Sequence, residues 1–330
     1  MKKRSKWIIV LGIFVVILLY VTYIYRSRDV KIGMEYTRGK TPGSFLVTFR
    51  DNYLIYKDDV LIEGDYENQG LYIKNIDSDY ENGDDILLSN DFYISPNVYK
   101  DWVYFVDNKN NLKKIKLDGS GEVYIIEGDN KTISDILVIE DTMYFIRNNE
   151  FEKNSLYAMS LNTNEIIEVE EDVNFRYLYD YCGSACVISS DRKRIIIYNH
   201  ENGQKQTYDN LETEIQGFLS NGSIIHYNNN KIYMRNSFES KKDTILGELE
   251  NIYRIIVHNK DMVIATLNEY GVIQVYEYNY KKDKLQKIAN ANHPPRDYND
   301  TYIACLSDSG FGNVELINRQ SGNIKIFSFK

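Results

Sequence analysis

A short sequence pattern recurs about every forty residues from residue 46 to the end of the chain. Each copy starts with a turn residue and continues at once into a run of β-branched and aromatic residues. The copies begin at Asp51, Asp101, Asp141, Ser184, Gly222, Asp261 and Asp300. A strand-rich repeat of this length is typical of the blades of a β-propeller. Seven starts predict seven blades, and six blades are the alternative, because the Ser184 copy is weak and the first copy is long.

Residues 136–169 show the expected order of one blade most clearly. Four runs of strand-forming residues, at 136–139, 143–146, 156–159 and 166–169, are separated by short clusters of turn residues. Consecutive strands joined by tight turns must pair antiparallel. The chain shows no convincing helical period after residue 30. We therefore predict an all-β fold of four-stranded antiparallel blades.

The first 25 residues have a different character. Residues 7–25 contain no charged side chain and follow Lys2, Lys3, Arg4 and Lys6. As a helix this run would be roughly 28 Å long, which matches the hydrocarbon core of a bilayer. A cleaved signal peptide is the alternative, but its apolar region is usually shorter and a small-residue cleavage site follows it. We expect one transmembrane helix that stays attached.

The charges around this run predict how the chain is divided. Four positive residues precede it, whereas Arg26, Arg28 and Lys31 follow it beside Asp29. The excess favours a cytoplasmic N-terminus. We expect a cytoplasmic tail (1–6), a membrane anchor (7–25), a stalk (26–45) and an extracellular propeller (46–330). We therefore expect a single-pass protein of the cell membrane.

The overall charge argues against nucleic-acid binding. The formal net charge is −9, whereas binding to phosphate backbones needs a basic face. The chain also contains 29 Tyr residues. Tyr favours strands, so this count is explained by strand content without a sugar-binding surface.

The chain has three cysteines, Cys182, Cys186 and Cys305. A low and odd count argues against a scaffold built on disulfides. Cys182 and Cys186 flank Gly-Ser-Ala, and a hairpin there could bring them opposite each other. A disulfide is one interpretation, and two small buried residues are the other. Cys305 lies in an apolar run and is expected in the core.

A calcium site is the strongest local candidate for ligand binding. Asp77, Asp79, Glu81 and Asp84 offer carboxylate oxygens in a short segment, and such ligands suit Ca²⁺. The helix–loop–helix calcium motif, however, has Gly at position 6 and Glu at position 12, where this chain has Asn82 and Leu88. The preferred interpretation is a solvated loop without a cofactor.

The sequence offers no clear catalytic group. His200, His226, His258 and His293 belong to different repeats, so a shared metal site would need the propeller channel to bring them together. The segment from Cys182 to Cys186 only superficially resembles a cysteine-protease nucleophile, and residues 308–312 are expected to form a turn.

Residues 101–163 are similar to bacterial cell-surface propellers of the TolB-like and YWTD-like kind. The likeness rests on Tyr-Phe-Val-Asp (104–107) and on Leu-Lys-Lys-Ile-Lys-Leu-Asp-Gly-Ser-Gly (112–121). The Tyr-Trp-Thr-Asp tetrad itself is absent. The resemblance implies the fold and an interaction role, and it carries over no catalytic residue.

Two functions fit these observations. The first is a membrane-anchored binding or scaffold module that holds a protein, peptide or glycan at the cell envelope, because rigid blades with variable loops suit binding. The second is an enzyme, a hydrolase or lyase of envelope polysaccharide with acidic residues lining the channel. The sequence favours the first and leaves catalysis uncertain.

Overall fold

Strands make up most of the chain that the computed structural model describes, which is residues 47–50, 53–62, 65–76, 85–128, 132–148, 154–173, 175–189, 194–199, 201–209, 214–258, 261–279, 284–306 and 314–327. Among these residues, no helix has the length and apolar character needed to span a bilayer. The predicted anchor (7–25) and stalk (26–45) lie outside the described residues.

The strands form seven antiparallel sheets of four consecutive strands, which we number as blades 1 to 7. Blade 1 contains β1 (Val47–Arg50), β2 (Tyr53–Ile62), β3 (Asp65–Asn75) and β4 (Ile86–Ser89). Blade 2 contains β5 (Phe92–Tyr99), β6 (Trp102–Asp107), β7 (Leu112–Lys116) and β8 (Val123–Ile126). Blade 3 contains β9 (Thr132–Ile139), β10 (Thr142–Asn148), β11 (Asn154–Ser160) and β12 (Ile166–Val173). Blade 4 contains β13 (Phe175–Tyr181), β14 (Ser184–Ser189), β15 (Ile195–Asn199) and β16 (Gln204–Tyr208).

The remaining blades follow the same order. Blade 5 contains β17 (Glu214–Phe218), β18 (Ile224–Asn228), β19 (Lys231–Arg235) and β20 (Asp243–Glu248). Blade 6 contains β21 (Ile252–His258), β22 (Asp261–Leu267), β23 (Ile273–Asn279) and β24 (Lys284–Ala291). Blade 7 contains β25 (Pro295–Tyr298), β26 (Tyr302–Cys305), β27 (Val314–Asn318) and β28 (Ile324–Phe327).

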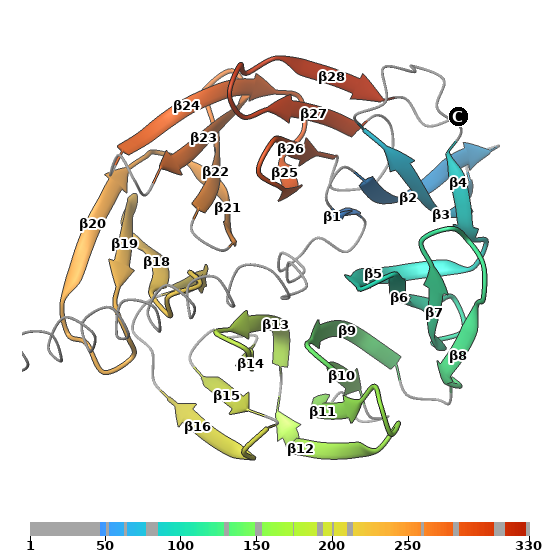
Figure 1. The fold of residues 1–330 in the computed structure, drawn as a ribbon. Coiled ribbons are helices and arrows are strands. Elements are labelled where there is room, and N and C mark those ends of the chain that lie inside the picture. The colour runs from blue at the N-terminus through green and yellow to red at the C-terminus, as the bar shows by residue number, and fades with distance from the viewer. Residues whose placement is uncertain are drawn as a thin grey trace, which may run out of the picture. The chain divides into compact units, whose positions relative to one another are not determined.

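The blades stand side by side in a ring, with the first strand of each blade innermost (Figure 1). Each inner strand contacts the inner strand of the next blade, and β25 contacts β1. The predicted β-propeller is confirmed, with seven blades rather than six. The strongly apolar runs of the repeat are the second strands, such as β6, β10 and β14, which are buried along nearly their whole length. They are apolar on both faces because a blade lies on either side of them.

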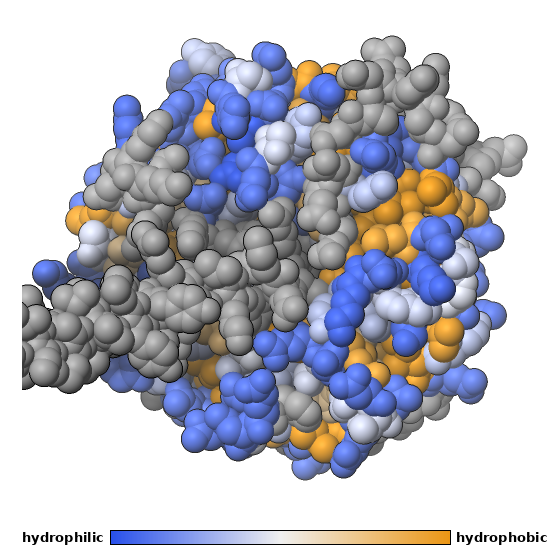
Figure 2. Space-filling view, viewed as in Figure 1, coloured by the Kyte–Doolittle hydropathy of each residue, from blue (hydrophilic) through white to orange (hydrophobic). Residues whose placement is uncertain are grey.

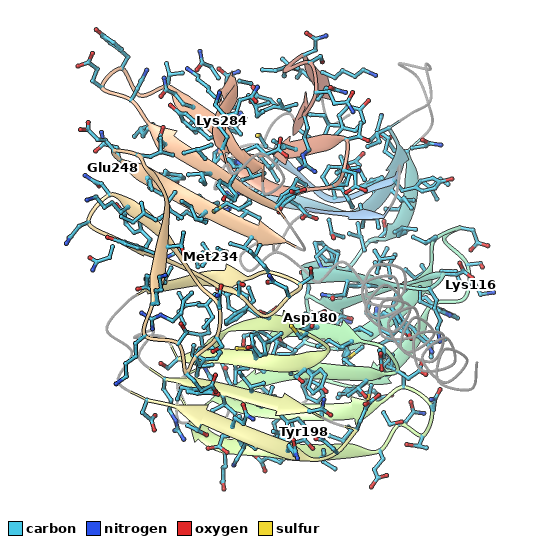
Figure 3. The ribbon with its side chains drawn as sticks, turned by 60° about the vertical axis from the view of Figure 1, so that its left-hand side comes forward. Lys116, Asp180, Tyr198, Met234, Glu248 and Lys284 are labelled. Atoms are coloured by element: carbon cyan, nitrogen blue, oxygen red, sulfur yellow. The ribbon has the colours of Figure 1, made fainter. Side chains whose placement is uncertain are left out.

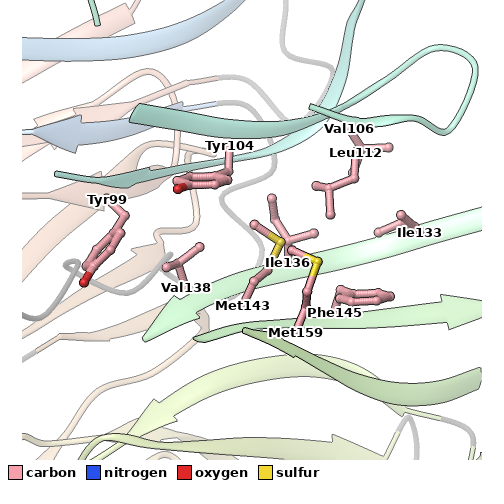
Figure 4. Packing of buried hydrophobic residues seen from close by; sticks show 10 residues of the cluster. All are labelled: Tyr99, Tyr104, Val106, Leu112, Ile133, Ile136, Val138, Met143, Phe145 and Met159. Carbon is pink, nitrogen blue, oxygen red and sulfur yellow. The ribbon is translucent and has the colours of Figure 1, made fainter. Parts of the chain in front are cut away.

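The core consists of apolar clusters that each join two neighbouring blades; we call the packed surface between two blades a seam. Figure 4 shows the seam between blades 2 and 3, where Val106 and Leu112 of blade 2 meet Ile136, Met143 and Phe145 of blade 3. Burying one such side chain stabilises the fold by roughly 1.5–3 kcal/mol. Stability is therefore distributed around the ring as contacts between neighbouring blades.

The ring closes without exchanging strands between its ends. The sequence predicts that blade 7 lacks an inner strand, because Pro294 and Pro295 interrupt it, and that residues 46–49 complete that blade. This prediction is wrong, because blade 7 has its own inner strand β25 and β1 belongs to blade 1. Pro295 is tolerated because it occupies the first position of β25, where a missing N–H is least costly. The closing contacts are a cluster that includes Phe49 and Tyr56 of blade 1 and Tyr302 and Leu316 of blade 7.

Buried polar side chains on the inner strands tie neighbouring blades together. Asn97 of β5 donates through Nδ2 to the carbonyl of Ile136 in β9 (2.9 Å) and accepts from the N–H of Val138 (3.4 Å). Asp297 of β25 accepts in the same way from the N–H of Phe49 in β1 (3.1 Å). Inner strands of different blades do not pair with each other, so these backbone groups need side-chain partners. The closing seam thus uses the same kind of bond as an internal seam.

A β-bulge recurs just before the inner-strand position that Asn97 and Asp297 occupy. The pairing of the inner strand with the second strand shifts register between Ile94 and Asn97 in blade 2, between Ile215 and Gly217 in blade 5 and between Pro295 and Asp297 in blade 7. Blade 5 has Gly217 where blades 2 and 7 have Asn97 and Asp297. A Cβ atom there would lie 2.8 Å from the Cβ of Val257 in blade 6, so the glycine permits close approach of the two blades.

We predict that Asp297→Ala lowers the free energy of unfolding by about 1–3 kcal/mol, because the buried N–H of Phe49 loses its partner. Asn97→Ala is the matched variant in the seam between blades 2 and 3, and it should cost a similar amount. Urea unfolding curves of both variants provide the measurement. A loss for Asn97→Ala with none for Asp297→Ala would show that the ring is not closed through Asp297.

Candidate binding surface

Exposed apolar side chains gather on the outer strands of blades 1 and 2. Ile86 and Leu87 on β4 are 46% and 39% exposed, and Val123 and Tyr124 on β8 are 44% and 54% exposed. We call these four residues the blade 1–2 patch. In Figure 2 the largest orange area of this face lies over the same two blades.

The two halves of the patch are brought together by the turn between β7 and β8. Gly119 lies in that turn with a φ of 81°. A Cβ atom added to it would lie 3.4 Å from the carbonyl oxygen of Leu87 and 3.5 Å from the Cγ2 of Ile86. Tyr124 lies on the side of blade 2 that packs against blade 1, because its cross-strand partner Lys113 shares a face with Ile115, which joins the cluster between blades 1 and 2. By the same register, Ile86 faces the seam beside Ile73, whereas Leu87 and Val123, each one residue along its strand, point to the opposite faces of their blades.

A buried network of charges holds Tyr124 in place. The ammonium of Lys113 lies 4.6 Å from the centre of the Tyr124 ring, which is a cation–π distance. That ammonium also lies 3.0 Å from a carboxylate oxygen of Asp107 and 3.0 Å from one of Glu122. Asp107 accepts further bonds from the backbone and side-chain nitrogens of Asn111 (2.8 and 2.7 Å). The Tyr124 ring thus contacts a buried ammonium while about half of its side chain stays exposed to water.

A second polar site lies where the inner strands turn into the second strands. Here the hydroxyl of Tyr99 and the ammonium of Lys100, in blade 2, both donate to Asp141 of blade 3 (3.1 and 3.0 Å). In the next blade, blade 4, Asp180 of β13 accepts a hydrogen bond from the N–H of Gly183 (2.9 Å) (Figure 3). Burial, with a smaller contribution from the charge of Glu140, raises the pKa of Asp180 to about 6. The Asp180 side chain is half-buried.

The proposed disulfide between Cys182 and Cys186 does not form, and both thiols are free. The hairpin has a two-residue turn at Cys182 and Gly183, with φ of 52° and 84°, as in a type I′ turn. Tyr181 therefore pairs with Ser184, and Cys186 faces Tyr179. Cys186 and Cys305 are buried, as expected for core residues.

Cys182 is also a poor nucleophile. Cys182 as a residue is exposed, but its thiol donates to the carbonyl of Ser220 in blade 5 (3.4 Å). Partial desolvation of the sulfur, followed by the charge of Asp180, raises its pKa to about 11. Reactive cysteines instead have a lowered pKa.

The histidines occupy separate positions. His226 is buried in blade 5, where Nε2 lies 3.2 Å from Asp243, which the guanidinium of Arg235 also binds (2.7 and 3.0 Å). Burial lowers the pKa of His226, so its ring is neutral. His293 precedes blade 7, and its backbone N–H donates to the carboxylate of Glu315 (3.4 Å). The side chains of His200 and His258, the calcium candidates Asp77, Asp79, Glu81 and Asp84, and the segment 308–312 lie outside the described residues. Within the described part of the chain, no three His, Cys, Asp or Glu side chains are placed to hold a metal ion.

Sequence reasoning missed the patch and the Asp107–Lys113 network. The signal for the patch was the pair of apolar residues at 86 and 87, which directly follow the acidic segment. The sequence pattern does not reveal the patch, because the apolar and polar residues of an outer strand alternate in the same way whether its exposed side chains contact water or a binding partner.

We predict that Cys182 reacts with iodoacetamide about a hundredfold more slowly than an unperturbed thiol at neutral pH, because a pKa of about 11 instead of 9.0 leaves that much less thiolate. The rate should rise steeply up to about pH 11. Mass spectrometry of the labelled full-length chain provides the measurement. A disulfide-linked peptide containing Cys182 and Cys186, or fast labelling at neutral pH, would contradict the structure.

Comparisons with known proteins support the fold alone. No protein-family model matches the sequence, and no curated protein matches it. The structure is similar to the acylaminoacyl peptidase of Pyrococcus horikoshii, with a TM-score of 0.63 and 14% identity over 89% of this chain and 53% of that one. It is similar to a puromycin hydrolase, with a TM-score of 0.57 and 12% identity over 89% of this chain and 54% of that one. An uncharacterized protein of Listeria monocytogenes has a TM-score of 0.50 and 12% identity, over 72% of this chain and 80% of that one. The chain thus spans about half the length of the peptidases that it resembles and is similar to them as a β-propeller.

Proposed function

We propose that the chain is a binding module of the cell envelope, anchored by residues 7–25, and that the blade 1–2 patch holds its partner. The observation that carries this proposal is the exposure of four large apolar side chains on two adjacent blades. Exposed apolar side chains that occur singly need no explanation, whereas several on neighbouring blades suggest an interaction site.

The composition of the patch favours a protein or peptide over a glycan. Three of its four side chains are aliphatic, and these contribute by apolar burial rather than by stacking on sugar rings. Strand β4 pairs with β3 on one side only. The outer edge of a sheet is a place where an extended peptide can add as a strand. Tyr124, held by Lys113, would act as a rigid aromatic anchor beside that strand.

An enzyme acting on envelope polysaccharide is the alternative, and one observation favours it. A carboxyl with a raised pKa beside a second carboxylate is the arrangement that many glycosidases use, and Asp180 and Glu140 resemble it. Asp180, however, lies on the face of β13 that packs toward blade 3, because Ala185 and Tyr198 follow it across the sheet and Tyr198 contacts Tyr144 of blade 3. The structural likeness to peptidases, at this identity, does not carry their activity to this chain.

We predict that Ile86→Glu abolishes capture of the partner and leaves the fold intact, because a charge in the patch must be desolvated on binding. Ile245→Glu is the matched control, since Ile245 is 56% exposed on the outer strand of blade 5, far around the ring from the patch. The full-length proteins would be cross-linked in the envelope of cells that make them, and the captured proteins quantified by mass spectrometry.

The proposal requires at least a tenfold loss of the main captured protein for Ile86→Glu and little change for Ile245→Glu. Equal capture by both variants would remove the patch as the site. Release of sugar fragments from purified envelope by the wild type, lost in Asp180→Asn, would instead favour the enzyme.

A further inference from the structure

Asp180 occupies a position that is apolar in other blades. In the hairpin between β13 and β14, the last strand pair before the turn is Tyr181 with Ser184. Asp180, opposite Ala185, belongs to the pair before it. The equivalent residues in blades 2, 3 and 6 are Val98, Val138 and Val257. Each of these valines is buried in the seam with the preceding blade. Blades 1, 5 and 7 have Phe49, Phe218 and Tyr298 there. Blade 4 therefore places a carboxyl where the other blades place valine or an aromatic side chain.

The surroundings of Asp180 favour its uncharged form. Its one hydrogen bond among the described residues comes from the N–H of Gly183, and no described Lys, Arg or His forms an ion pair with it. From blade 3, the turn that follows β9 contributes Glu140, whose negative charge opposes ionisation of Asp180. Asp141 in the same turn is engaged by Tyr99 and Lys100. In its own hairpin, the thiols of Cys182 and Cys186 and the phenol of Tyr181 stay neutral, because burial raises the pKa of all three.

We propose that Asp180 is a proton-operated latch in the seam between blades 3 and 4. When the carboxyl is protonated, it packs as the valines do and the seam is closed. When it is ionised, it repels Glu140 and requires water, so the hairpin tip at residues 181–184 separates from blade 3. Departures from a repeat pattern of this kind are expected at functional positions rather than at structural ones.

The direction of the pH effect follows from linkage. The pKa of Asp180 is raised from 3.8 to about 6 in the closed seam. The closed form thus binds a proton that the open form has released, and closure is favoured below that range. Stability of the seam is fully present in acid and is lost as pH rises from about 4 through about 6. The difference corresponds to a change in the opening equilibrium of up to about a hundredfold.

Hydrogen exchange of the full-length chain at about pH 5 and about pH 7.5, corrected for the intrinsic rate of exchange, tests this latch. We expect the blade 4 hairpin tip to exchange about tenfold faster at the higher pH, relative to the blade 2 tip at residues 99–102. Asp180→Asn should remove this difference, and Asp180→Val should close the seam at both values. Glu140→Gln should reduce the difference, because it removes the repulsion.

The blade 2 tip serves as an internal reference, since it has Val98 in place of the carboxyl. A pH response that persists in Asp180→Asn would overturn the latch. An equal response of the two hairpin tips in the wild type would overturn it as well, and that comparison needs no variant to fold.

Discussion

Closure of the ring depends on a bond between a buried inner-strand side chain and the backbone of the next blade, and the same kind of bond occurs in one internal seam. The inner strands of neighbouring blades do not form one sheet, so the N–H and C=O groups on their channel-facing edges cannot pair with each other. Asn97 satisfies these groups between blades 2 and 3, and Asp297 does so between blades 7 and 1. The β-bulge before each residue turns its side chain toward the neighbouring blade. Closure of the ring is thus a repetition of an internal contact and does not need a strand from the other end of the chain.

Much of this fold could be predicted from the sequence. The repeat gave the number of blades because the second strands are buried on both faces and are therefore apolar without interruption, as at residues 103–106 and 143–146. Ring closure was not predictable from the same signal. Pro295 argues against an inner strand on sequence grounds, yet a proline is tolerated at the first position of a strand, where it stands in β25. The tie at Asp297 could not be foreseen, since its partner Phe49 is 248 residues away.

The sites were less predictable than the fold. Side chains such as Ile86 and Tyr124 have the composition of ordinary strand residues, and only their exposure in the folded ring marks them as a surface. The pair Cys182 and Cys186 suggested a disulfide because of its spacing, but a two-residue turn places Cys186 opposite Tyr179. Asp180 became notable only when the register identified the valines that it replaces. In each case the missing information was the pairing of residues across strands, which composition does not contain.

The surface patch and the carboxyl latch lie in different seams of one rigid ring. Blades 1 and 2 carry the apolar patch, and blades 3 and 4 contain Asp180. Both features depend on a closed ring, because an open ring would let the blades on either side shift against each other. Residue-resolved hydrogen exchange of the Phe49 amide tests closure most directly. The structure predicts that this amide exchanges as slowly as that of Val138, which is bonded to Asn97. Exchange of Phe49 at the rate of an unprotected amide, with Val138 still protected, would show that the ring is open between blades 7 and 1.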